Sequence, residues 1–474
     1  MAKATLSPNV SLDLLSLEDN WSDVASPGLS ETIDNGCKFT ARLAMLYNNA
    51  KFSDVTLIVG GKKFYAHKLL LANASDVFEQ MLTSEHWPDS GQSQLVLQEQ
   101  EDCIPVFCDF LKYIYSGQVA LSMESVLGLL VLADKYNIPD LKDCCSAFMG
   151  QHLVTPPDQN KAITWYQYAI ACNSSNLQEA CYQYIVLNMD IIIQSPDWIY
   201  LDQHNLISLL QRSDLVVESE YVLLQAVVCW LSEDNRLKYL NENLSVILPH
   251  IRFPMILPEH LSEFEDSDFE KSNHDQFSPY LLSAYRYHAL SIRSKKQHFS
   301  SVPEMQFMYR NYTDDNYSIH VDVIRKAFKS CPRVSSKVEK PLSLPVNICN
   351  IAQDKLCKMK VTFYPQGYYT TSLWNGQLNL AKSTDFTKMI IAHRGGIELH
   401  EAEITILVYA WQKGVKYAHT AITKHHVFET YETYEIENIL DLEKLKMDQS
   451  PFIMDGALYL KVFVRPISFQ KPEP

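Results

Sequence analysis

Residue types that could perform chemistry are present in this 474-residue chain, but not at catalytic spacings. The sequence contains no Gly-x-Ser-x-Gly elbow, no His-Glu-x-x-His motif, no P-loop and no glycine-rich dinucleotide motif. His425 and His426 suggest a metal site. Adjacent residues of a strand point to opposite faces, however, so the two rings would not share one ion. The sequence therefore predicts a protein that is not an enzyme and uses no metal or cofactor.

The eleven cysteines are scattered along the chain, without a Cys-x-x-Cys pair or a paired Cys/His spacing. Several lie in apolar helical patterns, where a reduced thiol packs as a small hydrophobe. This distribution favours reduced cysteines over a disulfide framework.

Charge and hydropathy limit the partners. The formal net charge is −15, and no lysine- or arginine-rich run is present, so nucleic acid is not expected as a partner. No apolar run approaches ~18 residues, so no membrane span is expected. Residues 1–21 lack the basic and continuous apolar regions of a secretion signal. These features predict a cytoplasmic protein, with secretion as the alternative if a signal precedes the printed sequence.

The elements that must position any functional surface fall into three predicted domains after a flexible leader at residues 1–35. Residues 39–50 carry apolar side chains at helical spacing, residues 55–59 form a predicted strand that ends at Gly60-Gly61, and residues 67–81 return to helical spacing.

Several phrases in this region resemble the signature of the BTB/POZ family. They are FSDVTL at 52–57, FYAHKLLLA at 64–72, SDVF at 75–78, FLKYIYSG at 110–117 and LADKYNIPDL at 132–141. The resemblance implies an α+β domain over residues 36–150 that associates with a second copy of itself.

The next region, residues 155–292, is predicted to be all-helical because Leu177, Cys181 and Tyr184 follow a 3.6-residue period. It resembles a BACK domain through the phrases at 165–171, 223–230 and 251–255.

Beyond residue 303 the apolar period changes to two, at 359–364 and 458–464, which predicts an antiparallel β-sandwich over residues 303–468. This region resembles a TRAF-like (MATH) domain through residues 361–368 and 452–462.

The BTB resemblance implies a twofold dimer built on the first helix, where Phe39, Leu43 and Leu46 form an apolar stripe. The alternative is that this stripe covers the domain's own core. Asp54 and Lys68 occupy the positions of a charged pocket near the twofold axis of BTB dimers. A purely structural role for this pair is equally open.

The same resemblance points to the ubiquitin-ligase scaffold Cullin-3, which docks on a hydrophobic-x-acidic triplet. Trp87-Pro88-Asp89 fits that pattern, and Tyr113 is a further candidate. The alternative is an ordinary loop, since Pro88 alters the path of the chain.

TRAF-like domains hold extended peptides, and four aromatic residues suit a client groove: Tyr364, Tyr368, Tyr369 and Trp374. They equally suit the core or rim of the sandwich. The sequence thus predicts a dimeric adaptor that recruits an unknown protein client to a Cullin-3 ubiquitin ligase. The alternative is an oligomeric scaffold, cytosolic or secreted, that binds proteins or glycans.

Overall fold

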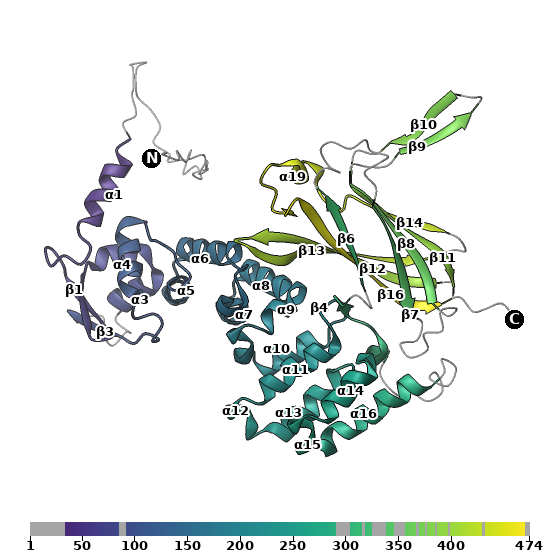
Figure 1. Ribbon diagram of the computed structural model, residues 1–474. Helices are drawn as coiled ribbons and strands as arrows, with labels where there is room; N and C mark the ends of the chain where they lie inside the picture. The colour runs from purple at the N-terminus through teal and green to yellow at the C-terminus, as the bar shows by residue number, and fades with distance from the viewer. Residues whose placement is uncertain are drawn as a thin grey trace.

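The computed structural model describes residues 34–84, 92–290, 304–314, 318–324, 338–345, 356–365, 369–374, 377–383, 386–396, 399–428 and 432–469. The chain passes from a mixed α/β region to a helical region and then to a strand-rich region (Figure 1). This succession confirms the fold class predicted from the sequence: an α+β domain, an all-helical domain and an antiparallel sandwich.

The first region is built on a small sheet with strand order β2-β1-β3. Strand β1 (Val55–Val59) forms a hairpin with β2 (Lys62–Ala66), and β3 (Gln94–Leu97) pairs with β1 in parallel. The two-residue turn at Gly60 and Gly61 has φ of +54° and +79°, values that glycine adopts without steric cost.

Six helices complete this region: α1 (Gly36–Ala44), α2 (Lys68–Ala74), α3 (Asp76–Thr83), α4 (Phe107–Ser116), α5 (Val126–Lys135) and α6 (Pro139–Gln151). The single helix predicted over residues 67–81 is therefore two. The chain is extended at Ser75, whose hydroxyl accepts the N–H of Phe78 at 3.1 Å and so begins α3.

The helical region contains ten α-helices: α7 (Ala162–Ala171), α8 (Ser175–Leu187), α9 (Met189–Ile192), α10 (Gln203–Leu210), α11 (Glu220–Leu231), α12 (Asp234–Leu237), α13 (Leu240–Ile247), α14 (Pro258–Glu265), α15 (Asp268–Ser272) and α16 (His274–Ala289). The indole N–H of Trp198 donates to the Ala226 carbonyl at 2.8 Å, so this large apolar side chain is buried with its polar atom satisfied.

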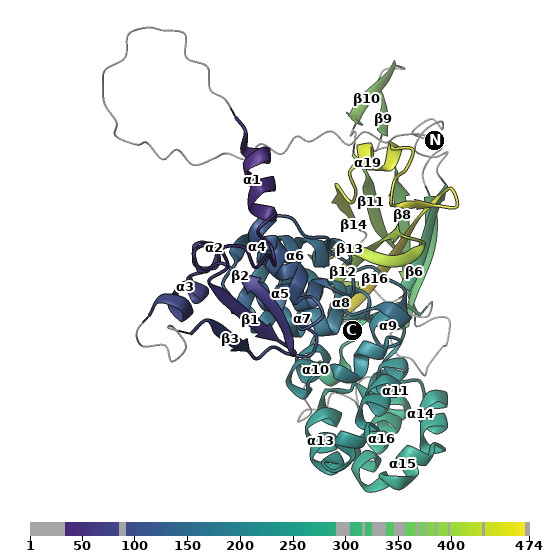
Figure 2. The same cartoon turned by 90° about the vertical axis from the view of Figure 1, so that its left-hand side faces the viewer.

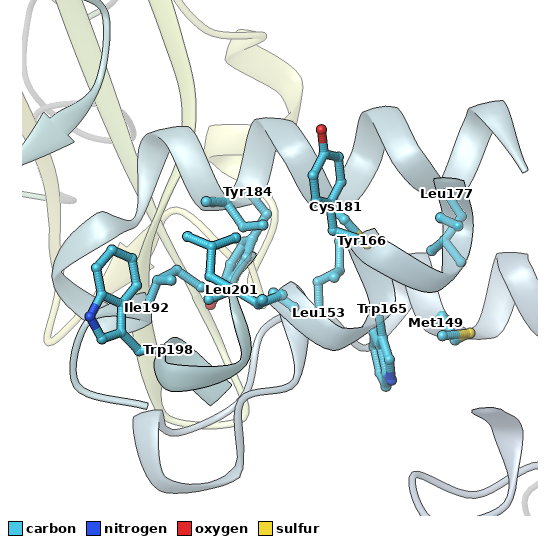
Figure 3. Packing of buried hydrophobic residues seen from close by; sticks show 14 of the residues in the cluster. Met149, Leu153, Trp165, Tyr166, Leu177, Cys181, Tyr184, Ile192, Trp198 and Leu201 are labelled. Atoms are coloured by element: carbon cyan, nitrogen blue, oxygen red, sulfur yellow. The ribbon is translucent and has the colours of Figure 1, made fainter. Parts of the chain in front are cut away.

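The α/β and helical regions share one apolar core. Met149 and Leu153, at the end of the first region, lie in the same cluster as Trp165 and Leu177 of the second (Figure 3). Because the interior is continuous, the two regions hold a fixed relative position.

Two antiparallel sheets form the sandwich. One has the order β14-β11-β8-β7, and the other has β13-β12-β16-β15, with β6 also paired to β16. Their strands are β6 (Ser318–Ile324), β7 (Val338–Pro345), β8 (Leu356–Tyr364), β11 (Lys388–Gly396), β12 (Leu399–Gln412), β13 (Val415–Val427), β14 (Thr433–Glu437), β15 (Ile453–Met454) and β16 (Ala457–Phe469). The helix α19 (Leu442–Lys446) precedes β15. The hairpin of β9 (Tyr369–Trp374) and β10 (Gln377–Ser383) stands apart from both sheets (Figure 1).

A short segment ties the sandwich back to the helical region. The 3-10 helix η5 (Glu304–Phe307) leads to β5 (Asn311–Tyr312), which pairs in parallel with β4 (Val216–Val217). Residues 304–314, here called the return segment, therefore pack on the helical region before the first sandwich strand. None of the helices that the structure describes has the length and apolarity to span a membrane.

Candidate interaction surfaces

Helix α1 presents apolar side chains that its own domain does not bury. None of its residues is buried, and Phe39 is 61% exposed. The helix stands away from the rest of the first region in both views (Figures 1 and 2). It ends at Ala44, earlier than predicted, and a turn in which Leu46 N–H donates to Leu43 O at 2.9 Å follows it. The role of this apolar area in dimerisation remains a prediction.

The residues of the predicted apolar stripe differ in their exposure to solvent. Leu43 and Leu46 are half-buried, and Leu46 packs against the core of the α/β region, whereas Phe39 remains open. The Tyr47 hydroxyl donates to the Cys108 carbonyl at 3.0 Å and anchors the end of this segment on α4. The base of the stripe therefore contributes to the fold, and its Phe39 end is exposed.

Asp54 and Lys68 lie together, as their assignment to one pocket requires. The Asp54 carboxylate accepts the backbone N–H of Lys68 at 2.8 Å, where α2 begins. A carboxylate at this position satisfies a helix-terminal donor and complements the helix dipole. The contact gives Asp54 a structural role, while the dimer role of the pair remains a prediction.

A buried pair next to Lys68 in the sequence, His67 with Tyr115, was not identified from the sequence. The Tyr115 hydroxyl accepts the His67 N–H at 3.0 Å and lies 3.0 Å from Nδ1 of the same residue. Burial raises the pKa of Tyr115 to about 12, so the hydroxyl remains protonated and can donate to that ring nitrogen. His67 lies inside the quoted phrase at 64–72, but its partner is 48 residues away and no local pattern indicates it.

The predicted cullin triplet lies outside the described residues, because Trp87 and Asp89 fall between 84 and 92. Tyr113 is half-buried on α4. Burial raises its pKa, and the nearby Asp140 and Cys144 of α6 add to that shift. Tyr113 thus faces α6, and its part in cullin binding remains a prediction.

The predicted client residues occupy separate elements. Tyr364 is half-buried at the end of β8, Tyr368 lies outside the described residues, and Tyr369 and Trp374 begin and end β9. A six-residue strand separates its first and last Cα atoms by roughly 16 Å. A groove uniting all four remains a prediction.

The junction between the helical region and the sandwich is more extensive than the sequence indicated. Asn188, at the end of α8, donates to the Ala418 carbonyl at 3.0 Å and accepts the Ala418 N–H at 2.6 Å. Beside this pair, Val216 packs on Leu407 and Phe463. Asn188 fits the helical period of α8, but nothing in the local sequence indicates a partner 230 residues away.

The return segment contributes one member of a buried ion pair to the junction. Arg310 and Glu220 form an ion pair of 2.8 Å with both side chains 0% exposed, and the Tyr312 hydroxyl donates to the same carboxylate at 2.6 Å. The backbone N–H of Arg252 also donates to Glu220, at 2.8 Å. Burial alone would raise the pKa of Glu220, but Arg310 and these donors hold it below its ordinary value.

The guanidinium of Arg252 binds both the return segment and the helical region. It donates to the Met308 carbonyl at 2.8 Å and to the Ser213 hydroxyl at 2.9 Å. From the sandwich, Arg465 donates to the carbonyls of Ser213 and Tyr309 at 2.8 and 3.0 Å. Strand β16, the return segment and the helical region thus meet through directed hydrogen bonds.

A carboxylate, that of Asp190, also lies at this junction. Its carboxylate accepts the Glu218 N–H at 2.8 Å and faces the Thr313 hydroxyl, with Lys461 and Tyr409 nearby. Burial raises the pKa of Asp190 to about 6, and repulsion from Glu218 adds to the shift, while the two donors and Lys461 oppose it.

We expect Asp190→Asn to raise the thermal unfolding midpoint at pH 7.5. The folded-state pKa of Asp190 lies above the ordinary value of about 3.9, so the ionised group costs stability above pH 6. That cost falls as pH drops through 6 and is absent below about 4, and a difference of about two pKa units corresponds to roughly 3 kcal/mol. Thermal unfolding between pH 5 and 7.5 measures it. Asp266→Asn, at an exposed aspartate, is the control, and equal pH profiles for wild type and Asp190→Asn would contradict the prediction.

Comparison with known proteins identifies three domains along the chain. Three family models match: BTB/POZ domain at residues 43–153, BTB And C-terminal Kelch (BACK) at 162–266, and BTBD17 TRAF domain at 307–468. The chain is therefore a BTB–BACK protein with a C-terminal TRAF domain. Such BTB and BACK domains indicate a protein-interaction adaptor, and no catalytic family is indicated.

The chain resembles BTB/POZ domain-containing protein 17 of Xenopus laevis, with 26% identity over 94% of each chain. Galectin-3-binding protein of Mesocricetus auratus is 29% identical over 58% of this chain and 47% of its own length. Among solved structures, the BTB domain of zebrafish PATZ1 aligns with 26% of this chain and 99% of its own at 24% identity, with a TM-score of 0.22.

Proposed function

We propose that this chain is a cytoplasmic, dimeric adaptor that brings a protein client to a Cullin-3 ubiquitin ligase. The BTB domain would bind both its own copy and the cullin, and the sandwich would capture the client. The observation that carries the proposal is the fixed placement of the sandwich relative to the BTB domain. Holding two reactants in a set geometry is how an adaptor that performs no chemistry itself promotes a reaction.

Contacts along the whole chain support this fixed placement. The BTB and BACK domains share one core, and Asn188, Arg252 and Arg465 join BACK, the return segment and the sandwich. A further hydrogen bond runs from the Gln412 side chain of β12 to the Gln151 carbonyl of α6, at 2.8 Å. A dimer of such units would present two client sites and so favour bivalent clients.

The decisive experiment is calorimetry of the full chain with the N-terminal domain of Cullin-3. The full chain is needed because Arg310 and Tyr312 satisfy Glu220 inside BACK, and a fragment without the return segment would lose both. We expect submicromolar binding, and we expect Trp87→Ala with Asp89→Lys to abolish it by removing an apolar anchor and reversing a charge.

Trp374→Ala is the matched control, since it removes a tryptophan from strand β9, outside the BTB domain, and should leave cullin binding unchanged. A well-folded wild-type dimer that shows no binding would sink the ligase proposal. Binding retained by the double variant would show that the cullin contact lies outside the triplet.

One finding favours a second candidate function. The resemblance to galectin-3-binding protein, which is named for a protein it binds, suits a scaffold that contacts proteins or glycans, in the cytosol or outside the cell. Such a scaffold would keep the dimer and the sandwich surfaces but would not bind the cullin, so the same calorimetry separates the two functions.

A further inference from the structure

Strand β3 is an edge strand of the small sheet in the BTB domain, and no strand in the described part of the chain pairs with its outer side. It is the last strand in the order β2-β1-β3 and is hydrogen-bonded to β1 alone. It lies at the rim of the α/β region in both views (Figures 1 and 2). An edge of this kind presents unpaired backbone donors and acceptors that can extend the sheet.

The register identifies the backbone groups on that outer side. Thr56 lies opposite Gln94, and the Thr56 N–H donates to the Ser93 carbonyl at 2.9 Å. In a parallel ladder a residue bonds to the residues before and after the one opposite it, so residues 93, 95 and 97 bond to β1. The N–H and C=O groups of Gln94 and Val96 therefore point outward. Among the residues that the structure describes, these groups have no hydrogen-bond partner.

The side chains around β3 do not protect this edge. Natural edge strands are protected by short length, a charged residue, a proline, a bulge or a covering element. Residues 91–98 read GQSQLVLQ, without a charge or a proline, and the pairing with β1 has no bulge. Val96 is 70% exposed. Apart from its short length, β3 therefore lacks these protective features. The edge strand on the other side of the sheet, β2, differs because it carries exposed Lys62 and Lys63.

We infer that β3 pairs with the β3 strand of a second copy of this chain, antiparallel and about a twofold axis at Leu95. In this register Gln94 of each copy lies opposite Val96 of the other, and these are the residues whose backbone groups point outward. The contact forms four main-chain hydrogen bonds and joins two three-stranded sheets into one. A second copy suits this edge because an uncharged strand meets itself without like-charge repulsion, which two copies of β2 would not.

The contact is separate from the apolar end of α1. Helix α1 and strand β3 lie on opposite sides of the α/β region in both views (Figures 1 and 2). A dimer formed through α1 therefore keeps two free β3 edges and associates further through them. Four hydrogen bonds and one small apolar contact lie far below the size of a stable interface, so we expect this association only at concentrations on the order of 100 µM. The inference goes beyond the proposed function and involves neither the cullin nor a client.

Sedimentation velocity of the full-length protein between ~2 and ~200 µM tests the association. We expect the weight-average mass of wild type to rise at least ~1.5-fold across this range, and that of Val96→Lys to stay constant. The substitution places an ammonium group on each of two neighbouring strands, and the exposed position of Val96 leaves the domain core unaffected. Ile170→Lys is the matched control: it adds the same charge at an exposed aliphatic residue of BACK and should behave as wild type does.

Amide hydrogen exchange on the same samples tests the register. The outward N–H groups of Gln94 and Val96 should exchange at least ~2-fold more slowly at ~200 µM than at ~2 µM. Those of Leu95 and Leu97 bond to β1 and should be protected equally at both concentrations. This pattern distinguishes β3 pairing from association through any other surface, because only the outward groups of one strand change.

A wild-type mass that stays constant up to the highest concentration would overturn the inference. So would a rise in mass that Val96→Lys shares, or a rise without slower exchange at Gln94 and Val96. Calorimetry with the cullin is carried out at micromolar protein, where β3 pairs are not populated, so a failure of cullin binding leaves this test unaffected. A constant mass would in turn leave the ligase proposal standing.

Discussion

Glu220→Ala is expected to lower the free energy of unfolding by roughly 3–5 kcal/mol, the cost of leaving one member of a buried ion pair without its partner. The substitution would leave the fully buried Arg310 guanidinium without a carboxylate and remove the acceptor of the Tyr312 hydroxyl. It would also free the Arg252 N–H. Urea denaturation followed by tryptophan fluorescence measures the change, with Trp198 and Trp230 as buried reporters in BACK.

Two further variants separate charge from shape at this position. Glu220→Gln keeps an acceptor oxygen and should be destabilised less than Glu220→Ala. Adding Arg310→Met to Glu220→Ala removes both charges and should recover part of the loss, because no unpaired ion remains. A Glu220→Ala protein as stable as wild type would show that the ion pair does not hold the return segment in place.

Phe39→Asp is expected to convert the proposed dimer to a monomer of 54.4 kDa without unfolding it. Burial of this exposed ring at an interface contributes roughly 2 kcal/mol, and a twofold dimer counts it twice. Losing both contributions weakens association by about a thousand-fold. Because α1 has no buried residue, the domain core should be unaffected.

Light scattering at micromolar protein measures the mass, and circular dichroism checks the fold. Tyr200→Asp is the matched control: it places the same charge on an exposed aromatic residue of BACK, and it should remain dimeric. A Phe39→Asp protein that keeps the dimeric mass would exclude the Phe39 end of α1 as the association surface.

Sequence patterns predicted many of the strands and helices because each of these elements depends on residues that are close together in the sequence. The strand at residues 55–59 follows from its run of apolar and β-branched residues, its turn follows from the two glycines, and the sandwich strands follow from the period of two. The break at Ser75 was missed because the apolar spacing continues across it, and the hydroxyl cap that begins the second helix has no effect on that spacing.

The junction between domains could not be predicted in the same way. Glu220 and Arg310 are 90 residues apart, and each in isolation looks like a surface charge. Asn188 fits a helical pattern yet serves the edge of a distant strand. The exposed Phe39 could be predicted only as part of a stripe, since the sequence does not show which end of that stripe the domain covers.

The return segment also bears on the order of events during synthesis. BACK helix α11 leaves the ribosome with Glu220, but the arginine that neutralises this carboxylate is added 90 residues later. At typical translation rates this delay is roughly 5–20 s. During that interval the nascent BACK domain holds a carboxylate that must stay hydrated. Its native interior is therefore expected to close only after the return segment has emerged, which makes residues 304–314 part of the folding unit of BACK although they lie beyond its last helix.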